Sequence, residues 1–186
     1  LANTTGTANT AVGTSALKTN VDGNCNVAIG EGALELNTGT SNTAVGRNAL
    51  TANAGGNQND AFGRHALDAN TSGDNNSAFG ASALGANTTA DNNVAMGYFA
   101  LGANTLGSNN VAIGVEALCG TIAGNNTAVG YRALKENGAT GYQNTAVGYL
   151  SLSCNTSGDG NSALGRESLE ANTTGANNTA VGYSSL

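Results

Sequence analysis

The chain has 186 residues, a net charge of −6 and only six Lys and Arg, which are scattered along the sequence. A nucleic-acid-binding surface needs clustered basic residues, so this composition argues against that class of protein. With 28 Gly, no Pro and 10% charged residues, it favours continuous backbone pairing broken by tight turns, because proline removes a backbone donor. The longest apolar runs are far shorter than about 18 residues, so no segment is predicted to span a membrane.

One pattern, Asn-x-Ala-hydrophobic-Gly-x-x-(Ala/Ser)-Leu, recurs from one end of the chain to the other. A period near 17 residues over the whole chain is the signature of a repeat architecture, and it predicts one repeat array over residues 1–186. Residues 1–8 resemble the end of a preceding repeat, and residue 186 ends a repeat core, so we expect a fragment of a longer fibre. The repeats start at Asn9, Asn26, Asn42, Asn59, Asn76, Asn93, Asn110, Asn126, Asn144, Asn161 and Asn178.

Positions are counted below from the Asn that starts each repeat. Positions 2 to 5 predict a short strand, in which side chains alternate between two faces. Position 4 is always apolar and shares one face with position 2. Position 3 is always Ala and position 5 always Gly, so on the other face another backbone can approach closely. The position 4 residues are Val12, Ile29, Val45, Phe62, Phe79, Met96, Ile113, Val129, Val147, Leu164 and Val181.

A second apolar column follows at position 9, which is always Leu. Together with Ala or Ser at position 8 it begins a second short segment, either extended or one helical turn; periodicity does not separate the two. A loop rich in Asn, Thr, Ser and Gly comes next, as in residues 70–75. The Leu residues are Leu17, Leu34, Leu50, Leu67, Leu84, Leu101, Leu118, Leu134, Leu152, Leu169 and Leu186.

About 17 residues suffice for two short strands and two turns, which is one rung of a parallel β-solenoid with rungs about 4.8 Å apart. Paired helices need about 30 residues or more per repeat, and a Gly in every repeat would weaken them. We therefore predict an all-β fold, a parallel β-solenoid or β-roll of about 17 residues per rung. The handedness of the solenoid stays open.

Equivalent residues would then stack as ladders. Position 1 gives one column of Asn, and position 12 gives a second, in which Thr121 is the exception. Amide ladders bond each rung to the next and stabilise the turns. The position 12 column comprises Asn20, Asn37, Asn53, Asn70, Asn87, Asn104, Asn137, Asn155 and Asn172.

Each rung offers about one bulky residue at position 4, one Leu and two small residues, which is a thin core for an isolated chain. We therefore expect one of the two apolar columns to fill the rung interior and the other to form a shared seam with identical chains. A three-fold bundle is the simplest closed arrangement of such rods, so the prediction is a homotrimer.

The segments Asn93–Gly97 and Asn110–Gly114, with sequences Asn-Val-Ala-Met-Gly and Asn-Val-Ala-Ile-Gly, resemble the head repeats of trimeric autotransporter adhesins. The longer form in residues 144–158 also resembles repeats of phage and large-virus tail-fibre and surface-fibre proteins. The resemblance implies a left-handed parallel β-roll that trimerises. The repeat here is longer than the adhesin head repeat, with the Leu and the Asn-Thr loop as the extra part.

A catalytic site needs a nucleophile, a base and an orienting group. The only histidine, His65, lies near Asp68 in sequence, and no base recurs beside the many Ser and Thr. His65 is interpreted as a solvated turn residue, with a pH-sensitive contact or an acid–base group as the alternative. No enzyme activity, cofactor or catalytic residue is predicted.

Two aspartates at position 16 of adjacent repeats, Asp74 and Asp91, form a candidate Ca²⁺ pair, with Asp159 at the same position later. The alternative is an ordinary solvated loop. The cysteines Cys25, Cys119 and Cys154 have neither disulfide-framework nor zinc-site spacing, and are read as buried or half-buried small residues.

Position 6 varies most and marks an outer face. Tyr98, Tyr131, Tyr149 and Tyr183 occupy it in four repeats and are the surface-contact candidates. Tyr131 and Tyr149 are expected to stack, either as a platform for sugars or simply as cover for the rung below. Glu31 and Arg47 are expected to form a weak ion pair. Glycan-acceptor patterns occur at Asn3, Asn70, Asn87, Asn155 and Asn172.

These observations favour a non-enzymatic structural segment of an extracellular fibre or adhesin on a virion or bacterial cell surface. It would act as a rod and as a possible attachment face for a cell-surface glycan or protein receptor. The alternative is a lattice that binds glycan or ice through regular Thr and Asn columns. Position 2 mixes Thr10 with Val27 and Asp60, which is uneven for a face that binds ice.

Overall fold

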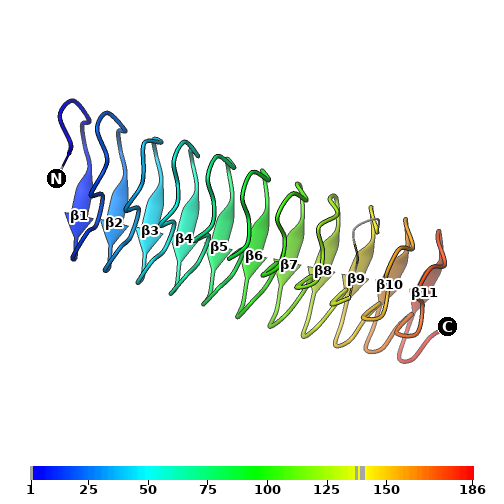
Figure 1. Cartoon of the computed structure of the whole chain (residues 1–186). Helices are drawn as coiled ribbons and strands as arrows, with labels where there is room; N and C mark the ends of the chain where they lie inside the picture. Colours follow the sequence, from blue (N-terminus) through cyan, green and yellow to red (C-terminus); the bar gives the residue numbers. More distant parts are fainter. Residues whose placement is uncertain (1, 137, 139–140) are drawn as a thin grey trace.

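The computed structural model describes residues 2–136, 138 and 141–186. The chain winds as a parallel β-solenoid whose rungs lie side by side, with the N-terminus at one end and the C-terminus at the other (Figure 1). Each rung contributes one three-residue strand, and the described residues form no helix. The all-β prediction is confirmed. The strands are β1 (Thr10–Val12), β2 (Val27–Ile29), β3 (Thr43–Val45), β4 (Asp60–Phe62), β5 (Ser77–Phe79), β6 (Val94–Met96), β7 (Val111–Ile113), β8 (Thr127–Val129), β9 (Thr145–Val147), β10 (Ser162–Leu164) and β11 (Thr179–Val181).

The strands form one parallel sheet in sequence order, from β1 to β11. Each strand pairs in register with the next, so that Ala61 lies beside Ala78, and Phe62 beside Phe79. Val129 and Val147 are likewise partners, across the longest repeat. Equivalent side chains therefore form continuous files, as the repeat pattern predicted. Among the described residues, no helix has the length and hydropathy needed to cross a bilayer.

The segment around position 9 forms turns, so the expected second strand or helical turn of each rung is not formed. The Leu residues of this column adopt a left-handed backbone conformation, as at Leu84 with φ 51°. The Leu84 amide donates to the carbonyl of Ala100 in the next rung at 3.0 Å, and the Ala83 amide closes a turn to Gly80 at 3.3 Å. Hydrogen bonds between rungs therefore continue in this segment, although its backbone is left-handed and not extended as in a strand.

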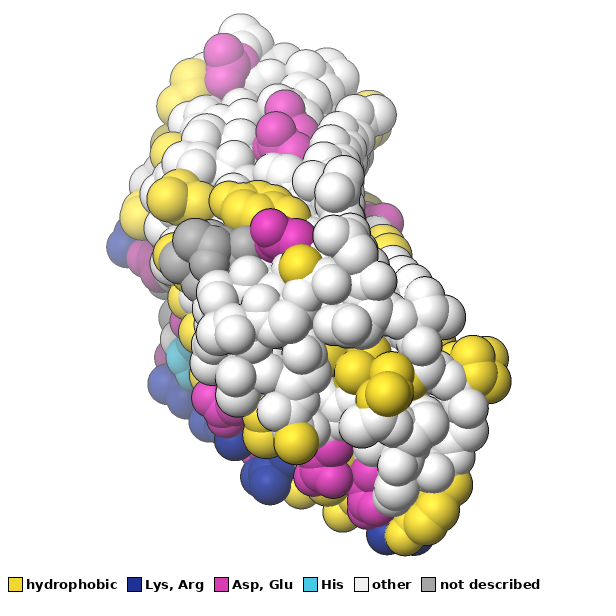
Figure 2. All heavy atoms as spheres, turned by 90° about the vertical axis from the view of Figure 1, so that its right-hand side faces the viewer, with side chains coloured by type: hydrophobic (Ala, Val, Ile, Leu, Met, Phe, Trp, Pro, Cys, Tyr) yellow, Lys and Arg dark blue, Asp and Glu magenta, His cyan; other side chains and the backbone are white. Residues whose placement is uncertain are grey.

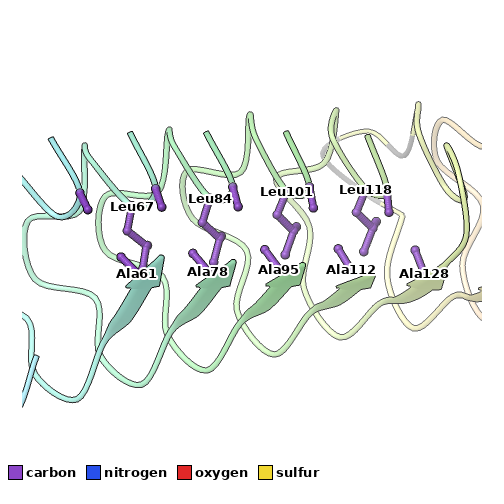
Figure 3. Close-up of a cluster of buried hydrophobic side chains, with 14 of the residues drawn as sticks. Ala61, Leu67, Ala78, Leu84, Ala95, Leu101, Ala112, Leu118 and Ala128 are labelled. Carbon is purple, nitrogen blue, oxygen red and sulfur yellow. The ribbon is translucent and has the colours of Figure 1, made fainter. Parts of the chain in front are cut away.

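The core lies between the sheet and these turns. Figure 3 shows Ala61, Ala78, Ala95 and Ala112 pointing from the strands toward Leu67, Leu84, Leu101 and Leu118 on the opposite segment. The position 9 Leu residues from Leu34 to Leu152 are fully buried, as are the Ala residues at positions 3 and 8 in the middle rungs. The Leu column is therefore the interior column, and position 4 points outward. This settles which of the two apolar columns fills the rung.

The invariant Gly at position 5 turns the chain out of the strand. At Gly97, φ is 138°, and an added Cβ would lie 2.5 Å from the carbonyl oxygen of Gly114 in the next rung. Both the backbone conformation and the close approach therefore exclude a side chain. This explains why each repeat has Gly at this position.

Both predicted Asn columns are buried amide ladders. In the position 12 column, Asn70 Nδ2 donates to Asn53 Oδ1 at 2.8 Å and to the carbonyl of Gly73 at 3.0 Å. In the position 1 column, the Asn76 backbone amide donates to Asn59 Oδ1 at 3.0 Å. Every buried side-chain nitrogen and oxygen of the described residues has a hydrogen-bond partner, so these polar columns carry little desolvation penalty.

The exception in the position 12 column is also explained. Thr121 Oγ1 accepts a hydrogen bond from the amide of Ala123 at 3.1 Å, so a hydroxyl stabilises the turn where an amide does so elsewhere. Asn137, the next member of the predicted column, lies outside the described residues.

Candidate functional site

An apolar column runs along the outward face of the sheet. It consists of the position 4 side chains, whose exposed fractions range from 37% at Phe62 to 68% at Val181 in the more open rungs. The rings of Phe62 and Phe79 stack at 4.9 Å between centroids with 4° between their planes. Contiguous exposed apolar patches are uncommon on folded monomeric proteins, so this column is a candidate interaction surface.

A second column, at position 6, follows the Gly bend. Tyr131 and Tyr149 stack at 5.3 Å with 15° between ring planes, which confirms that prediction. In the next two rungs the Arg166 guanidinium lies 5.4 Å from the ring centroids of both Tyr149 and Tyr183. Together, Tyr131, Tyr149, Arg166 and Tyr183 form a continuous aromatic and cationic pillar over four rungs, named the tyrosine pillar below.

The tyrosine pillar is held in place by a further contact. Arg166 Nη2 donates to Glu167 Oε1 at 2.9 Å, and this hydrogen bond raises the pKa of the exposed Arg166 guanidinium. Tyr131, Tyr149 and Tyr183 are 37%, 45% and 69% exposed, so their rings offer a partly open, pre-ordered surface. Tyr98, the fourth candidate, stands apart from the pillar and contacts Phe99 at 6.2 Å between centroids.

The basic residues occupy positions 6, 7 and 10 of their repeats and therefore gather along one side of the rod, although they are scattered in sequence. Figure 2, viewed from the C-terminal side, shows Lys and Arg along one flank with Asp and Glu beside them, and hydrophobic patches elsewhere on a mostly uncharged surface. The expected Glu31–Arg47 pair is formed, with 3.5 Å between Oε2 and Nε. Arg132 pairs with Glu116 at 2.7 Å. The flank carries mixed charge and is not a basic patch.

The aspartates proposed for Ca²⁺ lie in adjacent rungs and take part in the ladder. Asp74 Oδ1 accepts a hydrogen bond from the Asn57 amide at 2.7 Å, and Asp91 Oδ1 accepts one from the Asp74 amide at 2.7 Å. Asp159 accepts one from the Tyr142 amide at 2.8 Å. In the described part of the chain no third acidic, His or Cys ligand joins them. Their observed role is to bond one rung to the next.

Three rungs share a shallow depression on the side of the rung opposite the strands. It has a volume of about 430 Å³ and is lined mainly by His65, Asp68, Ser82, Gly85, Phe99 and Gly102. His65 Nδ1 lies 3.0 Å from Asp68 Oδ2, so this histidine is paired and only half-exposed. The sequence reasoning missed the depression. Its signal is Gly at position 10 in two consecutive repeats.

The structure also places the three cysteines and two of the glycan-acceptor asparagines. Cys119 is buried, but Cys25 and Cys154 are exposed free thiols, so the prediction of buried or half-buried cysteines is wrong for these two. Asn70 and Asn87 are fully buried, and their Nδ2 atoms donate within the ladder. Neither amide is accessible for glycan attachment in the folded chain.

Comparison of the chain with protein-family models, with curated proteins and with solved structures finds no match. The parallel β-solenoid with one in-register strand per repeat is nevertheless compatible with a β-roll repeat. The features that bear on function are therefore the solenoid fold and the two outward columns, at positions 4 and 6 of the repeat.

Proposed function

We propose that this chain is a structural repeat segment of an extracellular or virion fibre, in which three identical chains associate along the outward face of the sheet. The observation that carries the proposal is the outward apolar column at position 4, which continues over all eleven strands, with eight of its side chains exposed and Val45, Val129 and Val147 half-buried. The Leu column already fills the interior, and no other described segment of the chain covers the exposed side chains of this second apolar column.

The regular spacing of the column favours a second copy of the chain as its occupant. Strands succeed one another at about 4.8 Å, and only a partner with the same spacing meets every rung equivalently. An identical chain has that spacing because it is built from the same repeats. Three rods around one axis bury the column in a closed arrangement, and large obligate interfaces of this type are rich in apolar residues.

The surface role proposed for the rod is attachment. The tyrosine pillar provides rigid aromatic area with hydroxyl groups, which suits contact with a sugar or a protein receptor. The likeness of the repeats to those of trimeric adhesin heads and viral fibres supports a location on a virion or bacterial cell surface. No step of this proposal involves catalysis.

Multi-angle light scattering tests the assembly. For the purified chain of 18.1 kDa, the proposal expects a mass about threefold that of one chain, unchanged on dilution through the micromolar range. Small-angle X-ray scattering of the same sample should give the profile of a rod. A stable monomer would overturn the proposal, since the apolar column would then remain exposed in solution.

A further inference from the structure

The depression in rungs four to six results from a local change in the repeat. Position 10 carries a side chain in the flanking repeats, such as Asp68 before it and Cys119 after it, but Gly85 and Gly102 occupy it in the two repeats between. Without a side chain at Gly85, and with the Phe99 ring packed over Gly102, these rungs form an open hollow of about 430 Å³, within the size range of small-molecule pockets. The hollow is thus specific to these rungs.

One end of the hollow is an aromatic platform. An added Cβ on Gly102 would lie 2.6–2.7 Å from three ring carbons of Phe99, which shows that the phenyl ring lies directly on the backbone of Gly102. Gly102 is buried beneath it, while Phe99 itself remains half-exposed. The glycine therefore fixes the ring in place and leaves its surface open to the hollow.

The other end is polar. Asp68 Oδ2 is engaged by His65 Nδ1 at 3.0 Å, which orients the carboxylate. Asp68 Oδ1 lies 3.6 Å from the point that a Cβ on Gly85 would occupy, so it borders the floor of the hollow. Ser82 lines the same floor, and its hydroxyl can donate or accept a hydrogen bond.

We infer that this hollow binds a neutral pyranose sugar. An aromatic ring suits the apolar C–H face of a sugar, whereas an oriented carboxylate and a hydroxyl suit its hydroxyl groups. The net charge of −6 disfavours anionic ligands. The inference rests on the proposed role of the rod in attachment and names the ligand class and the residues that carry it. Gly85 and Gly102 directly follow Leu84 and Leu101, which Figure 3 shows on the segment opposite the strands, so the site lies away from the apolar column proposed for assembly.

Two variants remove the site by different means. Gly85→Thr fills the hollow with a side chain. Threonine occurs naturally at position 10 of another repeat, as Thr51, and its Cβ at residue 85 would lie 3.3 Å from the nearest atom, the carbonyl oxygen of Ser82. Phe99→Ser removes the aromatic platform. Serine is tolerated at this position of the repeat, because the preceding repeat has Ser82 there. The matched control is Tyr98→Thr, which removes the neighbouring aromatic ring, one that does not line the hollow.

The probes are the methyl glycosides of glucose, galactose, mannose and N-acetylglucosamine, titrated by saturation-transfer difference NMR, with choline as a cationic probe. We expect saturable binding of at least one glycoside, at least tenfold weaker in Gly85→Thr and in Phe99→Ser and unchanged in Tyr98→Thr. Thermal unfolding of each variant reports whether it is folded, so a variant that fails to fold leaves the other to decide.

Several results would overturn the inference: no saturable binding of any glycoside, binding that survives in the folded site variants, equal loss in Tyr98→Thr, or binding of choline alone. Light scattering on the same samples keeps this test separate from the proposed function. A trimer without sugar binding removes the inference only, and a monomer that binds sugar removes the proposed assembly only.

Discussion

The phenyl rings of Phe62 and Phe79 lie parallel, 4.9 Å apart, on the outward face of β4 and β5. The two residues are direct partners in the sheet register, so their stacking follows from the repeat itself. Both are 37% exposed, which leaves ring surface for a neighbouring chain to cover.

The double variant Phe62→Ser and Phe79→Ser is expected to weaken assembly without unfolding the rung. Each ring still has roughly 1 kcal/mol of apolar burial to gain at the interface, so the pair should raise the dissociation constant by at least about tenfold per chain. Sedimentation equilibrium measures this. The control Leu106→Ser removes an apolar side chain that is 64% exposed outside the column and should leave the assembly unchanged. Equal dissociation constants for the double variant and wild type would contradict the proposed interface.

Leu84→Ala is expected to destabilise the fold by about 2–5 kcal/mol, because it opens a cavity in a close-packed core. Leu84 is fully buried between neighbouring Leu side chains of the same column (Figure 3). Denaturant unfolding followed by circular dichroism gives the change in free energy. Leu36→Ala provides the comparison, since Leu36 is 49% exposed and its loss should change stability by about 0.5 kcal/mol or less.

Asn70→Asp tests the amide ladder and should make stability depend on pH. Asn70 Nδ2 donates to Asn53 Oδ1 and to the Gly73 carbonyl, so a carboxylate there would face two acceptor oxygens in a buried site. Its charged form is disfavoured, and the pKa of the new carboxyl is raised above its unfolded value. The folded state then holds its proton more tightly than the unfolded state, so stability falls as pH rises from the unfolded pKa to the raised folded pKa.

At pH 7 the loss for Asn70→Asp is expected to be about 3 kcal/mol or more, as for an unpaired buried charge, and smaller at pH 4. Unfolding curves at both pH values give the difference. Asn92→Asp is the control, because Asn92 is exposed and lies outside both ladders. A loss for Asn70→Asp that is equal at the two pH values would show that the site is more hydrated than the structure indicates.

The three free cysteines should react at different rates with iodoacetamide. Burial raises the pKa of the Cys119 thiol, and the nearby Glu116 carboxylate raises it further, so less of the reactive thiolate forms. Cys25 and Cys154 are exposed and should be labelled first at pH 8 in the folded protein. Peptide mass mapping over time gives the three rates. In denaturant the difference should disappear, and comparable rates in the folded chain would contradict the buried placement of Cys119.

The sequence predicted the parts of the fold that repeat without exception. The register seen between β8 and β9 follows from the strand pattern, which has Gly and Ala on one face and an apolar residue on the other. The two Asn columns likewise predicted the amide ladders. Adjacent tyrosines at one repeat position were enough to predict the stacking of Tyr131 on Tyr149.

Other features depended on backbone geometry that residue patterns do not encode. The left-handed conformation of Leu84 is unusual for a branched apolar residue, so a strand or a helical turn was the natural expectation at that position. Which apolar column lies inside followed only from the turn that directs Leu toward the strands. The depression was not predicted, although Gly85 and Gly102 occupy position 10 in two consecutive repeats.

The parallel register has one further consequence, for the length of the molecule. Each strand pairs only with the strands of the preceding and following repeats. Duplicating one repeat, such as residues 59–75, would add one layer and lengthen the rod by about 4.8 Å without requiring any new kind of contact. Rod length is thus a quantity that gene duplication can adjust in single steps, independently of the chemistry displayed along the sides.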